Sequence, residues 1–285
     1  MGDSKIGVLG AGQMGSGIAQ VSLVSDFQVI LSDVSEAVLA RSRAGIGKGL
    51  DILVRKEKIT VQEKEHALSG LRTTTEPGDF ASCDLVVEAA TEREELKLSL
   101  FRKLDEVVPA GRILATNTSS ISITRIAAAT KRPARVIGMH FMNPVPLMKL
   151  VEVIPGLQTS TETIEATMAF ARSLGKEPVP ANDFPGFLAN RILMPMINEA
   201  VYALMEGVGE AADIDAIMKM GANHPMGPLA LADLIGLDTC LEVMNVLQQG
   251  LGDSKYRPCP LLRKHVDAGY LGKKTGRGFY SYEKA

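Results

Sequence analysis

The sequence has few of the features that mark secreted, metal-binding or membrane-spanning proteins. Only 3 cysteines occur among 285 residues, and their wide separation favours reduced thiols over a disulfide framework. The 4 histidines do not cluster with the cysteines, so we expect no metal site. No apolar run reaches the roughly 18 residues of a membrane span, and the first residues lack the basic and apolar segments of a signal peptide. We therefore expect a cytoplasmic protein without a membrane partner.

An excess of charge of one sign is also missing. The formal net charge of −2 gives no reason to expect a nucleic acid or an anionic membrane as a partner. Hydrophobic residues make up 46% of the chain and charged residues 22%, which is typical of a soluble globular protein. The chain contains no internal repeat, and its length is sufficient for two domains.

Short strand-like runs alternate with helix-like segments over residues 1–182. This alternation predicts an α/β domain of the Rossmann type, with a doubly wound, mostly parallel sheet and helices on both faces. The expected strands are 5–9, 27–32, 71–74, 84–89, 112–116, 135–141 and 149–154. The expected helices are 13–25, 36–56, 60–69, 92–107, 122–129 and 161–174. The second and third of these helices form an inserted helical hairpin at about residues 36–69.

The pattern changes near Val179. Residues 178–185 are rich in turn-forming residues and are the expected linker. Beyond the linker, strand-like runs nearly vanish, so residues 183–285 are expected to form an all-helical domain. The helices expected there are 187–206, 210–220, 228–249 and 260–268. Pro195 lies inside the first of them and should kink it.

A glycine-rich fingerprint follows the first expected strand and begins the first expected helix. Gly10 allows a tight turn, Gly12 lets the backbone approach a pyrophosphate, and Gly15 lets the helix pack on the strand. Asp33 ends the next strand roughly 20 residues further on, where an acid can bind both ribose hydroxyls and would repel a 2′-phosphate. The pattern predicts an NAD site. The alternative is a glycine-rich turn that binds nothing.

The segment 138–154 contains the strongest indication of chemistry. His140 ends one apolar run and Glu152 lies inside the next, with a proline-rich turn between them. A histidine held by a carboxylate is the usual form of a general base that works near neutral pH. Either residue alone is more simply explained as a core histidine with its polar atoms bonded, or as an edge-strand carboxylate. Together, beside a dinucleotide fingerprint, they favour proton transfer during hydride transfer.

Two other polar positions allow two interpretations each. Residues 116–120, Thr-Asn-Thr-Ser-Ser, follow a strand and could bond a substrate oxygen or the nicotinamide ribose, or could cap the next helix. Asn190 lies among apolar residues near the start of the first helix after the linker. Its amide either bonds the contents of a cleft or caps its own helix.

Ordered motifs along almost the whole chain resemble those of the L-3-hydroxyacyl-CoA dehydrogenase family in its short, stand-alone form. The matching segments are GAGQMGSGIAQ, DLVVEA, NTSSISIT, HFMNPVPLMKLVEV, PGFLANR, HPMGPLALADLIGLDT and GKKTGRGFYSY. Within the family, the bacterial 3-hydroxybutyryl-CoA dehydrogenases are the most similar subtype. So many ordered matches are far more specific than a single motif.

The resemblance implies roles for four residues at the reacting centre. His140 resembles the catalytic base, and Glu152 the carboxylate that orients it and stabilises its protonated form. Ser119 resembles the residue that bonds the 3-oxygen of the substrate and the cofactor. Asn190 resembles the amide that binds and polarises the thioester-bearing substrate.

The resemblance also implies cofactor and CoA contacts. The NAD contacts implied beyond the three glycines and Asp33 are Gln13, Met14, Glu92, Lys97, Ser119, Asn143 and Lys274. Lys56 in the helical hairpin matches a basic residue that holds the phosphates of CoA, and a solvated basic turn at 55–58 is the alternative. Two departures affect binding. Gly49 replaces a serine that contacts CoA in many members, and Met142 replaces a phenylalanine near the acyl chain.

The residue patterns predict NAD-dependent hydride transfer, and the resemblance implies reversible oxidation of a short (S)-3-hydroxyacyl-CoA to the 3-oxoacyl-CoA. The expected partners are an acyl-CoA and a second copy of the chain, which dimerises through the C-terminal helices as the family does. A dehydrogenase of free hydroxy acids, such as sugar acids, could use the same scaffold. A non-catalytic NAD-binding structural or sensor protein is the alternative from another functional class.

Overall fold

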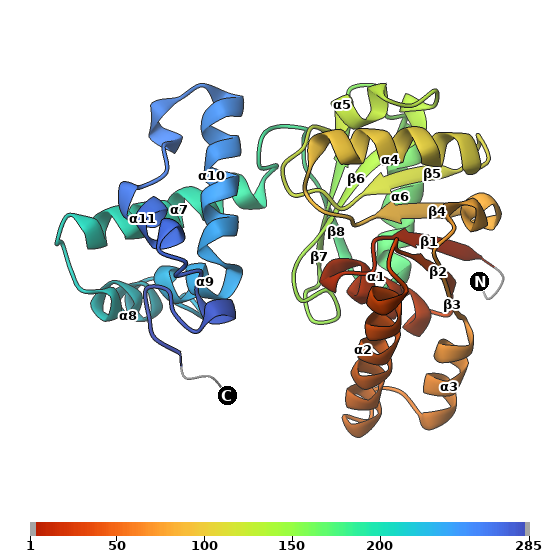
Figure 1. Ribbon diagram of the computed structural model, residues 1–285, viewed down its shortest axis with the longest axis horizontal. Coiled ribbons are helices and arrows are strands. Elements are labelled where there is room, and N and C mark those ends of the chain that lie inside the picture. Colours follow the sequence, from red (N-terminus) through yellow and green to blue (C-terminus); the bar gives the residue numbers. More distant parts are fainter. Residues whose placement is uncertain (1–3, 283–285) are drawn as a thin grey trace. The chain divides into compact units, whose positions relative to one another are not determined.

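A single sheet organises the N-terminal part of the chain (Figure 1). The computed structural model describes residues 4–282, and clustering of contacts separates two units, Met1–Asp183 and Phe184–Ala285. Within the described residues the first unit has eight strands, in the spatial order β3-β2-β1-β4-β5-β6-β7-β8. The strands are β1 (Lys5–Leu9), β2 (Gln28–Ser32), β3 (Leu71–Thr74), β4 (Leu85–Glu88), β5 (Ile113–Thr116), β6 (Val136–Phe141), β7 (Leu150–Pro155) and β8 (Glu177–Pro180).

The sheet is mostly parallel, as predicted. All neighbouring pairs are parallel except β6 and β7, which are antiparallel. The chain moves outward from β1 to β2 and β3, and then returns to β4 on the other side of β1. This reversal makes the carboxyl end of β1 the topological switch point, where doubly wound sheets bind their ligands.

Helices cover both faces of the sheet, so the predicted doubly wound α/β fold is confirmed. One core contains side chains of α1, α2, α3 and α6, and another contains side chains of α4 and α5. The helices are α1 (Gln13–Val24), α2 (Glu36–Arg55), α3 (Val61–Ser69), α4 (Glu94–Val107), α5 (Ile123–Ala128) and α6 (Thr161–Ser173). Figure 1 shows α2 and α3 projecting together beyond the sheet as the predicted hairpin.

The expected linker 178–185 is partly wrong, because its first three residues belong to the strand β8. Pro178 and Pro180 resemble turn residues in the sequence, yet both lie in a strand that pairs with β7. An edge strand tolerates proline because one side of it has no neighbour that needs an N–H donor. A short 3₁₀ segment, Pro77–Ser82, was also missed, and α4 begins at Glu94 rather than at residue 92.

The second unit is helical, as predicted. Its helices are α7 (Ala189–Met205), α8 (Ala211–Gly221), α9 (Pro228–Ile235), α10 (Leu237–Leu251) and α11 (Pro260–Asp267). The expected single helix 228–249 is wrong, because it breaks at Gly236. This residue has a φ of 106°, a backbone conformation that ends a right-handed helix and strongly favours glycine. No helix within residues 4–282 combines the length and apolar character needed to cross a membrane.

The packing of α1 on β1 depends on Gly15. A Cβ placed at Gly15 would overlap the carbonyl oxygen of Gly10 and would lie 3.4 Å from Cγ1 of Val8. Backbone atoms are the obstacle, so rotation of a side chain cannot relieve the overlap. The third glycine of the fingerprint is therefore required by the approach of helix to loop.

Substitution of Gly15 by alanine should lower the free energy of unfolding by about 1–3 kcal/mol or more, since overpacking forces backbone shifts. Chemical denaturation monitored by circular dichroism measures the change. Gly45→Ala is the matched control, because no atom lies within 4 Å of a Cβ built there. In that exposed helical position alanine should stabilise the protein by about 0.5–1 kcal/mol. Equal unfolding curves for the two variants would contradict the packing argument.

Candidate active site

The glycine-rich loop lies at the carboxyl end of β1, at the switch point of the sheet. Gly10 has a φ of 100°, and its N–H donates to the carbonyl of Ser32 at 2.7 Å. A Cβ at Gly10 would lie 2.7 Å from the carbonyl oxygen of Ala89, whereas Gly12 has no neighbour within 4 Å of a built Cβ. Gly10 thus permits close packing inside the protein, and Gly12 leaves an open approach at the start of α1.

Asp33 is fixed beside this loop by backbone donors. Its carboxylate accepts hydrogen bonds from the N–H of Ala11 at 2.9 Å and of Ser35 at 3.2 Å. The neighbouring Val34 is 97% exposed, which leaves an apolar surface beside the acid. Residues lining the adjoining cleft of about 440 Å³ include Gly12, Gln13, Met14, Asp33, Val34 and Ala89. A glycine cradle, an acid and an apolar wall together fit the adenosine half of a dinucleotide.

His140 and Glu152 form a buried pair across two strands. They are direct partners in the antiparallel register of β6 and β7, so their side chains lie on the same face. Nδ1 of His140 lies 2.8 Å from Oε2 of Glu152, and the two side chains are 8% and 3% exposed. A carboxylate at Nδ1 fixes the orientation of the ring and directs Nε2 away from the pair. The arrangement is that of an oriented general acid–base.

Asn143 lies next to the glycine-rich loop, where the sequence placed a cofactor contact. It belongs to the turn between β6 and β7, and its Oδ1 accepts a hydrogen bond from Nε2 of Gln13 at 3.1 Å. The structure therefore brings together two residues that are 130 positions apart and that the resemblance assigned to the same cofactor.

The loop carrying Ser119 is held by one carboxylate. Oε1 of Glu92 accepts hydrogen bonds from the hydroxyl of Thr118 at 2.5 Å and from the backbone N–H of Ser119 at 2.7 Å. It also accepts from the N–H of Ser120 at 3.1 Å. Glu92 thus fixes the backbone of the loop that carries Ser119.

Lys97 is more deeply buried than an open cofactor contact would require. Its ammonium group donates to both carboxylate oxygens of Glu88, at 2.7 and 3.0 Å, and to the carbonyl of Ala90 at 3.3 Å. It also lies 3.4 Å from Glu92, and its side chain is 1% exposed. This geometry supports a role through Glu92 and the Ser119 loop. Direct contact of Lys97 with a cofactor stays a prediction.

Glu88 is a residue of this network that sequence reasoning missed. It ends β4, is fully buried, and accepts hydrogen bonds from the hydroxyl of Thr116 and the N–H of Ala90, each at 2.7 Å. The signal was present, because Glu88 is a charged residue at the end of the apolar run LVVE, as Glu152 is within its own run. Removing one partner of such a buried pair typically costs about 3–5 kcal/mol.

Residues 116–120 make local turn contacts but do not provide the N-cap of α5, and their contact with a substrate or the nicotinamide ribose stays a prediction. Thr118 Oγ1 accepts the N–H of Ile121 at 3.0 Å, which is a local turn contact. The N-cap of α5 is Ser122 itself, whose Oγ accepts the N–H of Arg125 at 3.3 Å. Capping therefore does not require Ser119, whose backbone is held by Glu92.

The second unit holds two of the predicted site residues. Asn190 is the second residue of α7, which has Leu188 as its N-cap. The role of its amide in binding the contents of a cleft stays a prediction. Lys274 donates to Oδ2 of Asp238 at 2.7 Å, near the turn at Gly236.

The hairpin presents Lys56 at its tip, where it is exposed as the C-cap of α2. Gly49 faces Gln20 of α1, and a Cβ there would overlap the amide oxygen of Gln20. Glycine at 49 is therefore matched to a long side chain on the helix beneath it. The CoA role of Lys56 stays a prediction.

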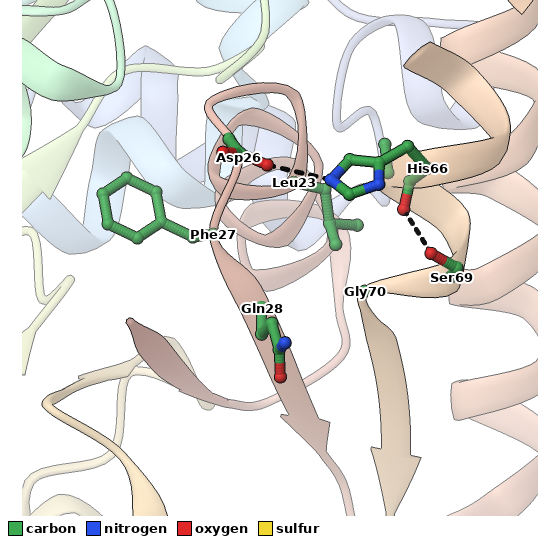
Figure 2. Close-up of a pocket in the computed structure, with 8 residues that line it drawn as sticks. Leu23, Asp26, Phe27, Gln28, His66, Ser69 and Gly70 are labelled. Atoms are coloured by element: carbon green, nitrogen blue, oxygen red, sulfur yellow. Dashed lines mark hydrogen bonds and ion pairs between the residues drawn. The ribbon is translucent and has the colours of Figure 1, made fainter. Parts of the chain in front are cut away.

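A separate pocket lies where the hairpin joins the sheet (Figure 2). Nε2 of His66 in α3 lies 2.9 Å from Oδ1 of Asp26, which follows α1, and both side chains are mostly exposed. The hydroxyl of Ser69 donates to the carbonyl of His66 at 2.7 Å. Exposed pairs of this kind typically contribute about 0–1 kcal/mol. The residues lining this pocket include none of the predicted site residues.

Two family models cover the chain in succession. Residues 5–184 match the 3-hydroxyacyl-CoA dehydrogenase NAD binding domain, and residues 186–282 match the 3-hydroxyacyl-CoA dehydrogenase C-terminal domain.

Curated relatives and a solved structure agree with these matches. A probable 3-hydroxybutyryl-CoA dehydrogenase of Deinococcus radiodurans is 58% identical over 98% of this chain and 100% of its own length. The 3-hydroxybutyryl-CoA dehydrogenase of Bradyrhizobium diazoefficiens is 56% identical, covering 99% and 96% of the two chains. The crystal structure of (S)-3-hydroxybutyryl-CoA dehydrogenase from Ralstonia eutropha superposes with a TM-score of 0.95 at 51% identity, covering 98% and 99% of the chains. Together with the geometry of the site, these matches establish that the chain belongs to the 3-hydroxyacyl-CoA dehydrogenase family.

Proposed function

We propose that this protein catalyses the reversible, NAD-dependent oxidation of short (S)-3-hydroxyacyl-CoA thioesters, with 3-hydroxybutyryl-CoA as the main substrate. The observation that carries the proposal is the buried His140–Glu152 pair, with a 2.8 Å contact, in the same unit as a dinucleotide fingerprint. The relatives named for 3-hydroxybutyryl-CoA support the choice of substrate.

The loop of Gly10, Gly12 and Gly15 would hold the pyrophosphate of the cofactor, and Asp33 the ribose of its adenosine half. When bound, NAD supplies the acceptor for the hydride that leaves C3 of the substrate. Since both oxygens of Asp33 are fixed by backbone donors, the acid cannot easily move aside for a 2′-phosphate. The site should therefore prefer NAD to NADP.

His140 acts as the general base in oxidation and as the general acid in reduction. In oxidation its Nε2 takes the proton of the 3-hydroxyl group while the C3–H bond breaks. Glu152 stabilises the imidazolium that forms, because a nearby opposite charge favours the protonated ring. In reduction the protonated ring returns the proton to the 3-oxygen.

Ser119 would donate a hydrogen bond to the 3-oxygen, and Asn190 would bind the thioester carbonyl. Lys56 on the hairpin would hold the phosphates of CoA, where a flexible, charged side chain suits a phosphate group. Met142, partly buried beside Asn143, would contribute to the choice of acyl length.

The C-terminal unit would bind substrate and pair two copies of the chain. Six large apolar side chains among the described residues of this unit are more than half exposed, and apolar surface of this kind can mark an interface. They are Phe184, Ile192, Val208, Ile217, Met220 and Leu234. A homodimer through these helices would bury such surface.

A cytoplasmic, reducing location suits the cysteines. Cys83, Cys240 and Cys259 are free and buried. Burial raises the pKa of Cys83 and of Cys240 to about 12, so neither thiol is a nucleophile at neutral pH.

The substrate proposal is tested by comparing acetoacetyl-CoA with acetoacetate, each with NADH and with NADPH. The account predicts the highest kcat/KM for acetoacetyl-CoA with NADH, because only the thioester offers CoA to the hairpin and only NADH lacks the 2′-phosphate that Asp33 would repel. Oxidation of NADH at 340 nm measures the rate. Acetoacetate used as well as its thioester would favour a free hydroxy-acid dehydrogenase. NADH binding with no turnover of any 3-oxoacyl-CoA would indicate a non-catalytic protein.

Replacing His140 with glutamine should lower kcat for acetoacetyl-CoA reduction by about 10²–10⁴-fold, the usual contribution of a general acid–base group. Glutamine keeps a polar side chain of similar size, so NADH affinity by fluorescence titration should stay near that of the wild type. Wild-type kcat in this variant would contradict the role of His140 as the general acid–base.

A further inference from the structure

Lys176 is a buried lysine that no part of the proposed reaction uses. It lies just before β8 and is 8% exposed. Its ammonium group donates to the backbone carbonyls of Val145 at 2.5 Å and Met148 at 2.9 Å. Among residues 4–282 no carboxylate lies within ion-pair distance of it. A buried charge is costly unless it is bonded, so these two carbonyls are its main compensation within the protein.

Both carbonyls belong to the β6–β7 loop, residues 142–149, which joins the strand of His140 to the strand of Glu152. This loop has a second anchor on α1. Val145 is 2% exposed, and a Cβ at Gly17 would lie 2.8 Å from Cβ of Val145. The missing side chain at Gly17 thus makes room for Val145. Val145 is therefore held twice: its side chain packs against Gly17, and its carbonyl accepts a hydrogen bond from Lys176.

The third attachment of the loop reaches the cofactor fingerprint. Asn143 bonds to Gln13 at 3.1 Å, one residue after the open glycine of the cradle. The loop therefore links the general acid–base strands to the loop and helix that hold the dinucleotide. Of the two polar attachments, the pair of bonds from Lys176 is more buried than the bond between Asn143 and Gln13.

We propose that Lys176 is a positioning residue, whose buried ammonium fixes the β6–β7 loop so that Asn143 faces the cofactor while His140 stays opposite Glu152. The inference rests on the proposed function for the role of Asn143 and His140. An apolar side chain at 176 would fill similar space but would remove the donor of two loop carbonyls. An unsatisfied buried carbonyl is costly, so the loop would shift to expose these groups to water. Burial lowers the pKa of Lys176, because the surroundings of its amino group are poorly solvated.

The test compares Lys176→Met with Lys103→Met, which removes the same charge from an exposed position on α4. For Lys176→Met we expect the dissociation constant and the KM of NADH to rise about tenfold, the scale of losing hydrogen bonds to a charged group. The KM of acetoacetyl-CoA should change much less. Lys176→Arg, which keeps a charged donor, should recover part of the NADH affinity. Lys103→Met should match the wild type.

A purely structural lysine would give a different pattern. If Lys176→Met lowered only the melting temperature and kept wild-type NADH affinity and kcat at temperatures where it is folded, the positioning role would be overturned. If Lys176→Met does not fold, Asn143→Ala provides the test, because Asn143 is exposed. Unchanged NADH affinity in Asn143→Ala would show that the β6–β7 loop does not contribute to cofactor binding and would overturn the inference. NADH affinity is measured without any acyl substrate, so a failure of the proposed reaction and a failure of this inference give separate results.

Discussion

Buried charge on three interior strands of the sheet is the constraint on which the rest of the site depends. The last residue of β4 is Glu88, the fifth residue of β6 is His140, and Glu152 lies opposite His140 in β7. Each of these groups is nearly inaccessible to water, so each must have a partner within the protein. Glu88 has Lys97 and Thr116, and His140 has Glu152. These partners come from neighbouring strands or from the helix that follows, so the sheet register and the chemistry are fixed together.

The same constraint explains how the loops around the site are held. Glu92 collects the N–H groups of the Ser119 loop, and Lys97 lies between Glu92 and Glu88. On the other side, Lys176 occupies two carbonyls of the loop that carries Asn143. Loops at strand ends are usually mobile, but charged side chains beneath these two loops satisfy backbone groups that would otherwise face water. A preorganised set of donors and acceptors is what hydride and proton transfer require, because the protein then does not reorganise during the reaction.

Much of this could be predicted from sequence, and the reasons differ between elements. The glycine fingerprint with Asp33 is local, so its strand, turn and helix followed from spacing alone. His140 and Glu152 were found because a charged residue inside an apolar run demands a partner. The same argument applied to Glu88 would have found that residue too. Lys176 could not be found in this way, because its partners are backbone carbonyls, which leave no mark in the sequence.

Other errors came from residues that act differently in different contexts. Pro178 and Pro180 predicted a linker, but an edge strand accepts both. A continuous apolar pattern hid the break at Gly236, because periodicity does not report a positive φ. Lys97 is a different case, because its cofactor contact, implied by resemblance alone, stays a prediction. Its burial depends on the positions of Glu88 and Glu92 in space, which the sequence does not give.

The central claim is that His140 and Glu152 act as one acid–base unit. The most direct measurement is a double-mutant cycle on kcat for acetoacetyl-CoA reduction, using His140→Gln, Glu152→Gln and the double variant. Residues that act as a unit have strongly non-additive effects. The account therefore predicts that the double variant loses no more activity than His140→Gln alone. Losses that multiply would show that the two residues act independently and would contradict the claim.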